Sequence, residues 1–304
     1  MNRYPTALLL AVVISADATL PLAAVPDLGA IDDRQIKKRF EQGMGKLKDE
    51  DATPKPETIQ KQLKERKHHP VELPDVLAVP KPGPGAPLPP DVYDQRKASV
   101  LCFGNIYKCD NCNNWHGNLA GGFVITADGV AVTNYHVMEN AKAGAFGAIT
   151  YDGKVHMVEE VLAASKRDDL AIVKLSGADF TPAPIAEMAR VGSNVIAISH
   201  PEGRFYTASE GIVSRYYKQS TRKGDGPARV AITADFAKGS SGCPVFNADG
   251  FVIAVVASTN SIYYSRDDEG NESSLQMVVK SCIPSSAILR LLAKDQANPQ
   301  EGGG

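Results

Sequence analysis

A tight glycine-rich turn near residue 240 presents a serine in a setting typical of a nucleophile. Residues 239–244 read Gly-Ser-Ser-Gly-Cys-Pro, which matches the pattern G-x-S-G-x-P. A nucleophilic hydroxyl needs such a turn, because its oxygen must project while nearby backbone N–H groups converge on one point. Gly239 permits a backbone conformation that a side chain would obstruct. The pattern therefore predicts Ser241 as a nucleophile and the amides of Gly239 and Ser241 as an oxyanion hole.

Two further residues could complete the chemistry of this serine. His136 follows the apolar segment 130–133, at the expected end of a strand, where an imidazole can take up a hydroxyl proton. Asp169 directly precedes the apolar run 170–173, and a carboxylate there can accept the imidazole N–H and stabilise the imidazolium. Each signal is weak alone. Together, in the order His136, Asp169, Ser241, they predict a catalytic triad.

The segments that must position these residues have the pattern of a β protein. Residues 123–126 and 130–133 flank the turn Ala127-Asp128-Gly129, and the same arrangement recurs around residues 247–250. Further strands are expected at 170–175, 194–199, 211–214 and 251–256. Short strands at regular spacing, separated by many turns, predict an all-β barrel or sandwich. A short apolar helix is expected at 287–292.

The N-terminus has the order of a secretory signal peptide. Arg3 precedes an apolar run at 7–14, and Ala16 and Ala18 provide a small-x-small cleavage site. The run is too short to span a bilayer, which needs about 20 residues. We therefore expect a signal peptide over residues 1–18, no membrane span in the mature chain, and a secreted or periplasmic location.

Residues 19–95 differ in composition from the rest of the chain. A helix is predicted from Asp32 or Asp33, because apolar side chains then recur at helical spacing; Gly43 and Gly45 should weaken it. A second, narrower helix is predicted after Pro56. The proline-rich residues 70–90 predict an extended linker. The expected domains are this N-terminal extension, which would act as a prosegment, docking arm or oligomerisation element, then a domain over 96–295 and a flexible tail over 296–304.

Composition limits the class of protein. The chain has 304 residues, of which 43% are hydrophobic and 22% charged, and its formal net charge is -2. A sizeable core can be buried, which excludes wholesale disorder. The chain has no basic excess of the kind that nucleic-acid binders show. We expect a polypeptide substrate and no cofactor, and the composition leaves the oligomeric state open.

The five cysteines are Cys102, Cys109, Cys112, Cys243 and Cys282, an odd number. The spacing of Cys109 and Cys112 is C-x-x-C, with His116 nearby. A local disulfide is the leading expectation, and a metal site or inert thiols are the alternatives. A zinc site normally needs a second pair of ligands. For that reason no metal is predicted.

Several segments together resemble the trypsin-like serine peptidases of the chymotrypsin superfamily, and most closely their bacterial HtrA-type branch. They are residues 122–136, residues 169–173, the turn at Ser241, residues 190–201, residues 210–214 and residues 283–285. The resemblance covers residues 97–293, about two thirds of the chain. It implies two antiparallel six-stranded β-barrels with the triad in the cleft between them. It also implies that Asp169, rather than Asp168, is the acid.

The chain departs from that family at several positions. HtrA-type members usually carry PDZ domains after the protease, whereas only about twenty residues follow Pro284 here, so no PDZ domain is expected. Ser240 stands where digestive trypsins carry the aspartate that pairs with a new N-terminus. Asp235 lies six residues before Ser241, where trypsin-like enzymes keep the acid that binds Arg or Lys. Lys280, near the other wall of the expected pocket, could instead favour an acidic substrate side chain.

Three functions are compatible with these observations. A serine endopeptidase is the leading one, since all three triad motifs are intact. The second is a non-catalytic, peptide-binding or chaperone-like relative of the same fold. The third is a thiol-redox or metal-binding protein that uses Cys109 and Cys112.

Overall fold

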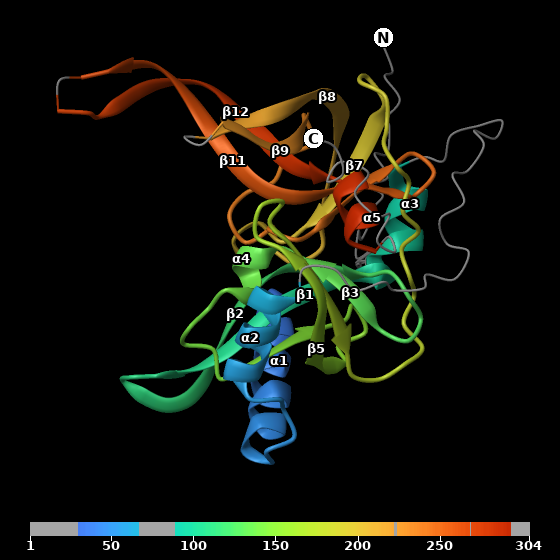
Figure 1. Ribbon diagram of the computed structural model, residues 1–304, viewed down its shortest axis with the longest axis vertical. Coiled ribbons are helices and arrows are strands. Elements are labelled where there is room, and N and C mark those ends of the chain that lie inside the picture. The colour runs from blue at the N-terminus through green and yellow to red at the C-terminus, as the bar shows by residue number, and fades with distance from the viewer. Residues whose placement is uncertain (1–29, 67–88, 222–223, 268, 293–304) are drawn as a thin grey trace, which may run out of the picture. The chain divides into compact units, whose positions relative to one another are not determined.

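The computed structural model describes residues 30–66, 89–221, 224–267 and 269–292. The described residues from Ile31 onward form one compact unit that is built around two closed six-stranded barrels, as the family resemblance implied (Figure 1). Every strand pairing in both barrels is antiparallel. The predicted signal peptide and the predicted tail lie outside the described residues.

The first barrel has the strand order β1-β2-β3-β6-β5-β4. Its strands are β1 (Val100–Cys109), β2 (Cys112–Val124), β3 (Val130–Thr133), β4 (Ala145–Ile149), β5 (Val155–Ser165) and β6 (Leu170–Leu175). All residues of β3 and nearly all of β6 are buried, which explains why both strands are continuous apolar runs in the sequence. The short helix α4 (Tyr135–Met138) follows β3 directly.

The second barrel has the order β10-β11-β12-β9-β8-β7. Its strands are β7 (Asn194–Ser199), β8 (Thr207–Thr221), β9 (Gly224–Ile232), β10 (Pro244–Asn247), β11 (Val252–Arg266) and β12 (Glu272–Pro284). Strands β11 and β12 continue well beyond the barrel as a long hairpin, visible in orange in Figure 1. The sequence predicted only the barrel part of β11, because the outer half of this strand is exposed and lacks the apolar run of a core strand. Helix α5 (Ser286–Leu292) forms where the apolar helix was expected.

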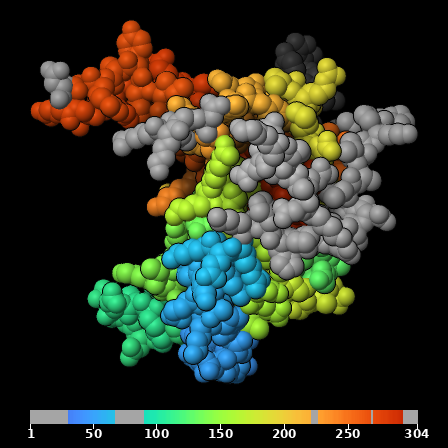
Figure 2. All heavy atoms as spheres, in the orientation of Figure 1, coloured from blue at the N-terminus to red at the C-terminus, as the bar shows by residue number. Residues whose placement is uncertain are grey.

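The N-terminal extension packs on the first barrel. Helix α1 (Asp33–Asp49) begins at the N-cap Asp32, and α2 (Pro56–Glu65) follows. Figure 2 shows both helices, in blue, against the green strands of that barrel. Phe40 and Met44 of α1 are fully buried, and Ile59 and Leu63 of α2 are each only 2% exposed. The predicted apolar stripes are therefore the faces that these helices bury.

The two glycines of α1 are contact points. A Cβ at Gly43 would lie 2.8 Å from Val155, and a Cβ at Gly45 would lie 2.7 Å from the Trp115 ring. Their cost in helix propensity is thus offset by close packing against the barrel.

The prediction of an extended linker through residue 90 is wrong at its C-terminal end. Helix α3 (Pro89–Arg96) begins inside the proline-rich stretch and leads into a short 3₁₀ helix, Lys97–Ser99. Proline is tolerated in the first turn of a helix, where its missing N–H has no intrahelical partner to lose. The preceding prolines, as far as Pro87, lie outside the described residues.

Candidate active site

The side chains of His136 and Asp169 are paired. His136 Nδ1 lies 2.9 Å from Asp169 Oδ2 and 3.0 Å from Oδ1. The backbone N–H of His136 also donates to Asp169 Oδ1, at 3.0 Å. One carboxylate therefore holds both the ring and the main chain of the histidine, which leaves Nε2 directed away from the aspartate.

This pair exists because two elements of the first barrel end side by side. His136 lies in α4, immediately after β3, and Asp169 immediately precedes β6, which pairs with β3. The carbonyl of Asp169 accepts from Asn134 Nδ2 at 3.0 Å and from the Tyr135 N–H at 3.2 Å. These bonds hold Asp169 at a φ of 66°, a left-handed conformation that few residues other than glycine adopt. Such strain often accompanies functional sites.

The neighbouring Asp168 takes no part in this pair. Its carboxylate accepts from Ser165 Oγ at 3.0 Å and lies 3.7 Å from Arg290. The resemblance had favoured Asp169 as the acid, and the geometry brings Asp169, not Asp168, to the histidine.

The environment of His136 favours its protonated form. The hydrogen bond to the Asp169 carboxylate raises the pKa of His136 above its ordinary value. Partial burial opposes this rise, and the nearby charges of Asp169 and Glu139 add to it. An imidazole in this setting can accept a proton and keep it while a reaction intermediate forms.

The turn that carries Ser241 is bound from both barrels. Gly121 of β2 donates its N–H to Ser241 O at 2.7 Å, and the Gly242 N–H donates to Val256 O of β11 at 2.9 Å. A Cβ at Gly242, where φ is 87°, would lie 2.2 Å from Gly121 O. Only glycine allows the first barrel to come this close. The glycines of the motif therefore serve the contact between barrels as well as the turn itself.

The Lys238–Gly239 peptide has a defined orientation. The Lys238 carbonyl accepts from the Glu202 N–H at 2.7 Å, and the Ser240 N–H donates to Ala237 O at 3.1 Å. The second of these bonds closes a four-residue turn over residues 237–240. Gly239, at a φ of 96°, occupies the third position of that turn. In a trans peptide the N–H points opposite to the carbonyl. The Gly239 N–H is therefore directed away from Glu202.

The amides of Gly239 and Ser241 are available to a ligand. Within the described part of the chain, neither N–H donates to a protein acceptor. The role of Glu202 in this arrangement was missed by sequence reasoning. No local signal marks it, because its contribution is a backbone N–H about 36 positions from the residue that it binds.

His136 and Ser241 border one cleft of about 640 Å³. The cleft is also lined by Gly239, by Glu202 and by Lys37 of helix α1. Ser241 Oγ donates to Ala257 O at 3.5 Å, and among the described residues no hydrogen bond joins it to His136. Hydrogen bonds between catalytic groups are often loose in ligand-free sites.

The two expected specificity residues pair with each other. Lys280 Nζ lies 2.5 Å from Asp235 Oδ1 and donates to Phe236 O at 2.6 Å. The Asp235 side chain is 82% exposed, whereas that of Lys280 is 15% exposed. The structure therefore does not provide the buried, unpaired carboxylate that would select a basic substrate side chain.

The expected disulfide is not formed, since all five cysteines are free thiols. Three of them (Cys102, Cys243 and Cys282) are fully buried, and burial raises the pKa of each thiol. The other two (Cys109 and Cys112) lie at the tip of the β1–β2 hairpin.

Comparison with known families finds one matching domain family, the trypsin-like peptidase domain, over residues 120–255. A relative from Rhizobium meliloti, named probable periplasmic serine endoprotease DegP-like, is 35% identical over 139 residues, or 44% of this chain and 26% of its own. One of the same name from Marinomonas sp. is 30% identical over 182 residues, or 57% of this chain and 35% of its own. The chain thus spans only about a quarter to a third of the length of these relatives.

Solved structures share the fold. The HtrA-type protease AlgW with a tripeptide aligns with a TM-score of 0.52 at 20% identity, covering 67% of this chain and 62% of its own. AlgW with a decapeptide aligns with a TM-score of 0.54 at 17% identity, covering 67% and 66%. Residues 120–255 therefore match the trypsin-like peptidase domain family, and this part of the chain is similar to DegP-like and HtrA-type proteases.

Proposed function

We propose that this protein is a serine endopeptidase that cleaves peptide bonds through an acyl-enzyme, with His136, Asp169 and Ser241 as its triad. The observation that carries the proposal is the Asp169–His136 pair, in which the carboxylate binds both the backbone N–H and the ring of the histidine. His136 and Ser241 border the same cleft. A carboxylate in that position selects the imidazole tautomer with a free Nε2, which is the form that accepts a serine proton.

In the proposed reaction, Ser241 Oγ attacks the scissile carbonyl carbon while His136 Nε2 takes its proton. The oxyanion that forms is held by the N–H groups of Gly239 and Ser241, and each such donor is worth about 3–4 kcal/mol in other proteases. His136 then protonates the leaving amine, and a water molecule hydrolyses the ester with the same base. The orientation of the Lys238–Gly239 peptide supports this role, because its carbonyl is held on the opposite side by Glu202.

A strand edge beside Ser241 suits an extended peptide. β10 pairs with β11 as far as Val255, and the Ser241 turn continues this contact to Val256. In the described residues, no strand pairs with that side of β11 from Ala257 onward. A substrate can therefore add as an antiparallel strand. This would bring its scissile bond to Ser241 Oγ, which lies 3.5 Å from Ala257 O.

The Asp235–Lys280 pair bears on the choice of substrate. Because the two charges neutralise each other, we infer that the enzyme discriminates only weakly between basic, acidic and neutral side chains at the residue before the scissile bond. The sequences at the cut sites of a denatured protein measure this preference directly. A strict requirement for Arg or Lys would contradict it.

The test of the proposed activity is hydrolysis of denatured casein by the full chain and by two variants. Ser241→Ala should lose cleavage and lose labelling by a fluorophosphonate probe. Ser240→Ala is the matched control and should keep both, since the buried Ser240 hydroxyl has no hydrogen-bond partner among the described residues. Equal cleavage by Ser241→Ala and the parent chain would exclude Ser241 as the nucleophile. Binding of casein without cleavage by the parent chain would favour the peptide-binding function.

We also infer that the protein is exported, with residues 1–18 as its signal peptide and a secreted or periplasmic location. The support is the N-terminal sequence pattern and the periplasmic names of the relatives. Among the described residues, no helix is long and apolar enough to cross a membrane. The N-terminal residue of the protein recovered from cell fractions would test this inference.

A further inference from the structure

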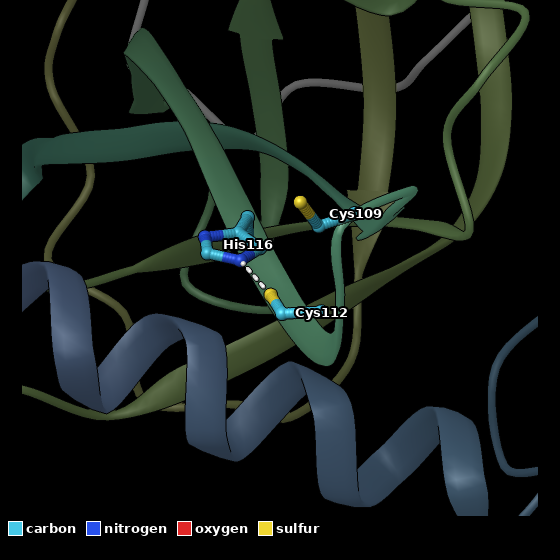
Figure 3. Close-up of side chains that lie close together, drawn as sticks. All are labelled: Cys109, Cys112 and His116. Carbon is cyan, nitrogen blue, oxygen red and sulfur yellow. Dashed lines mark hydrogen bonds between the residues drawn. The ribbon is translucent and has the colours of Figure 1, made fainter.

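The tip of the β1–β2 hairpin gathers three side chains that all ligate thiophilic metal ions. Sγ of Cys109, Sγ of Cys112 and one ring nitrogen of His116 lie within 4.8 Å of one another. Figure 3 shows the three side chains together on this hairpin, with a hydrogen bond between Cys112 and His116. None of them is needed by the proposed peptidase reaction.

The backbone of the hairpin is shaped to bring them together. In a regular strand, residues four apart are separated by about 13 Å. Here Cys112 Sγ and His116 Nε2 lie only 3.1 Å apart. The register explains this, because Lys108 pairs with Trp115 while Cys109 pairs with Cys112. Asn113 and Asn114 thus form a bulge that folds Cys112 back toward the imidazole, and such bulges often re-aim a side chain at a functional site.

The distances fit one tetrahedral ion. Zinc–sulfur bonds of about 2.3 Å and zinc–nitrogen bonds of about 2.0–2.1 Å place ligand atoms roughly 3.5–3.8 Å apart around a tetrahedron. The three atoms on the hairpin lie within 4.8 Å, and the closest pair is 3.1 Å apart. Small side-chain rotations would therefore complete three of the four positions.

The chemistry of the donors also fits a cation. The thiolate is the form that binds metals. A disulfide between Cys109 and Cys112 would leave His116 without a role in the cluster, whereas a metal ion uses all three groups.

We propose that Cys109, Cys112 and His116 form a binding site for one zinc ion, with a fourth coordination position open to water or to a ligand from outside the chain. Binding releases the protons of whichever thiols are still protonated, and involves no change of oxidation state. The ion would tie β1 to the bulged start of β2 and so order the hairpin tip.

The hairpin is already anchored to helix α1 without the ion. Trp115 Nε1 donates to Asp49 Oδ1 of α1 at 3.1 Å, and the Trp115 ring packs against Gly45. Trp115 is the one tryptophan of the chain and directly precedes the ligand His116. It therefore provides an intrinsic fluorescence reporter for metal bound at this site.

The test uses the full chain, reduced and stripped of metal by a chelator, with Co²⁺ as the probe. One equivalent of Co²⁺ should produce a thiolate-to-cobalt charge-transfer band, the visible bands of a tetrahedral site, and quenching of Trp115 fluorescence. Added Zn²⁺ should remove all three signals. The buried thiols of Cys102, Cys243 and Cys282 are fully enclosed and should contribute nothing.

Variants separate this site from adventitious binding. Cys112→Ser and His116→Ala should each weaken Co²⁺ binding by more than about a hundredfold, since even second-shell changes cost 10- to 100-fold. Asp110→Asn, in the same turn but outside the cluster, is the matched control and should bind as the parent does. Thermal unfolding of the metal-free variants, equal to that of the metal-free parent, would show that they fold.

Three results would overturn the proposal. These are the lack of a charge-transfer band, an unchanged spectrum in Cys112→Ser, and a Cys109–Cys112 disulfide that persists under reductant and bars the ion. Because every readout is spectroscopic, failure of this site is distinguishable from failure of the proposed peptidase activity.

Discussion

Asp33 Oδ1 accepts a hydrogen bond of 2.8 Å from the backbone N–H of Phe205, across 172 positions of the chain. Asp33 begins helix α1 of the N-terminal extension, and Phe205 lies in the loop between β7 and β8 of the second barrel. Glu41 of the same helix accepts from the Gly117 N–H of the first barrel at 2.8 Å. Helix α1 therefore bridges the two barrels.

The loop that Asp33 holds is the one that orients the candidate oxyanion hole. It includes Glu202, whose N–H binds Lys238 O, and it is also held by His200, whose Nδ1 accepts from the Tyr206 N–H at 3.0 Å. The extension thus acts on the cleft through one backbone loop. We propose that the described part of residues 19–95 is a positioning element of the domain assigned to residues 96–295.

Substitution of Asp33 should lower activity through this loop. In Asp33→Ala the Phe205 N–H loses its acceptor and the loop between β7 and β8 loosens. Because this loop orients the Gly239 N–H, kcat on a peptide substrate should fall several-fold, with little change in KM. The matched control is Asp32→Ala. It removes the N-cap, which accepts from Gln35 at 3.1 Å, and costs helix stability of about 1 kcal/mol while leaving the loop contact intact. Equal kcat values for the two variants would show that Asp33 does not act on the cleft through this loop.

The Asp169–His136 pair sets the expected pH dependence of activity. The raised pKa of His136 means that the neutral form needed as a base is lost as pH falls through that raised value. The acidic limb of kcat/KM should therefore lie above pH 6.5, the ordinary value for histidine. Asp169→Asn should move this limb to lower pH and reduce kcat by about four orders of magnitude, as in a related triad. An acidic limb that does not move in Asp169→Asn would contradict the assignment of that limb to His136.

Buried His200 should make the fold sensitive to acid. Burial lowers the pKa of His200 to about 4, and its Nδ1 accepts the Tyr206 N–H at 3.0 Å, a bond that only the neutral ring can make. The unfolded chain takes up this proton near pH 6.5, so the stability is present above pH 6.5 and lost as pH falls to about 4. The loss amounts to about 3 kcal/mol.

Denaturant unfolding between pH 7 and pH 4 measures this contribution. His200→Gln keeps a donor for Leu101 O and cannot titrate. The difference in unfolding free energy between the parent and the variant should shrink by about 3 kcal/mol over that range. A constant difference would show that His200 is not the group responsible.

Gly121 of β2 should tolerate no side chain. A Cβ there would lie 2.1 Å from Cys243 Sγ and 2.7 Å from Cys243 N, where the two barrels meet. Gly121→Ala should destabilise the fold by about 1–3 kcal/mol and displace the Ser241 turn, with loss of activity. Its neighbour Gly122 is the matched control, because a Cβ there would lie 3.1 Å from the nearest atom, the carbonyl oxygen of Val132.

A second substitution tests the cause of this clash. Cys243→Gly removes the sulfur and should restore part of the stability of Gly121→Ala, while the contact with Cys243 N remains. Unfolding free energies of the two single variants and the double variant measure the coupling. Strict additivity would show that the sulfur is not the obstacle.

Residue type and spacing were enough to predict the local parts of this protein. Apolar runs predicted β3, β6, β7 and the barrel part of β11, because a strand buried on both faces reads as such a run. The Ser241 motif and the positions of His136 and Asp169 at strand ends were evident from residue type and spacing. Helices α1 and α2 were expected from the recurrence of their apolar residues.

Contacts between groups that are distant in the sequence could not be predicted in this way. The pairing of Asp33 with Phe205, the hold of Glu202 on Lys238, and the neutralisation of Asp235 by Lys280 join residues that no sequence period relates. The cluster on the β1–β2 hairpin depends on a two-residue bulge that shifts the strand register. Backbone hydrogen bonds and close glycine contacts depend on where the chain lies rather than on which side chains it carries, so they arise only when the two barrels and helix α1 are packed together.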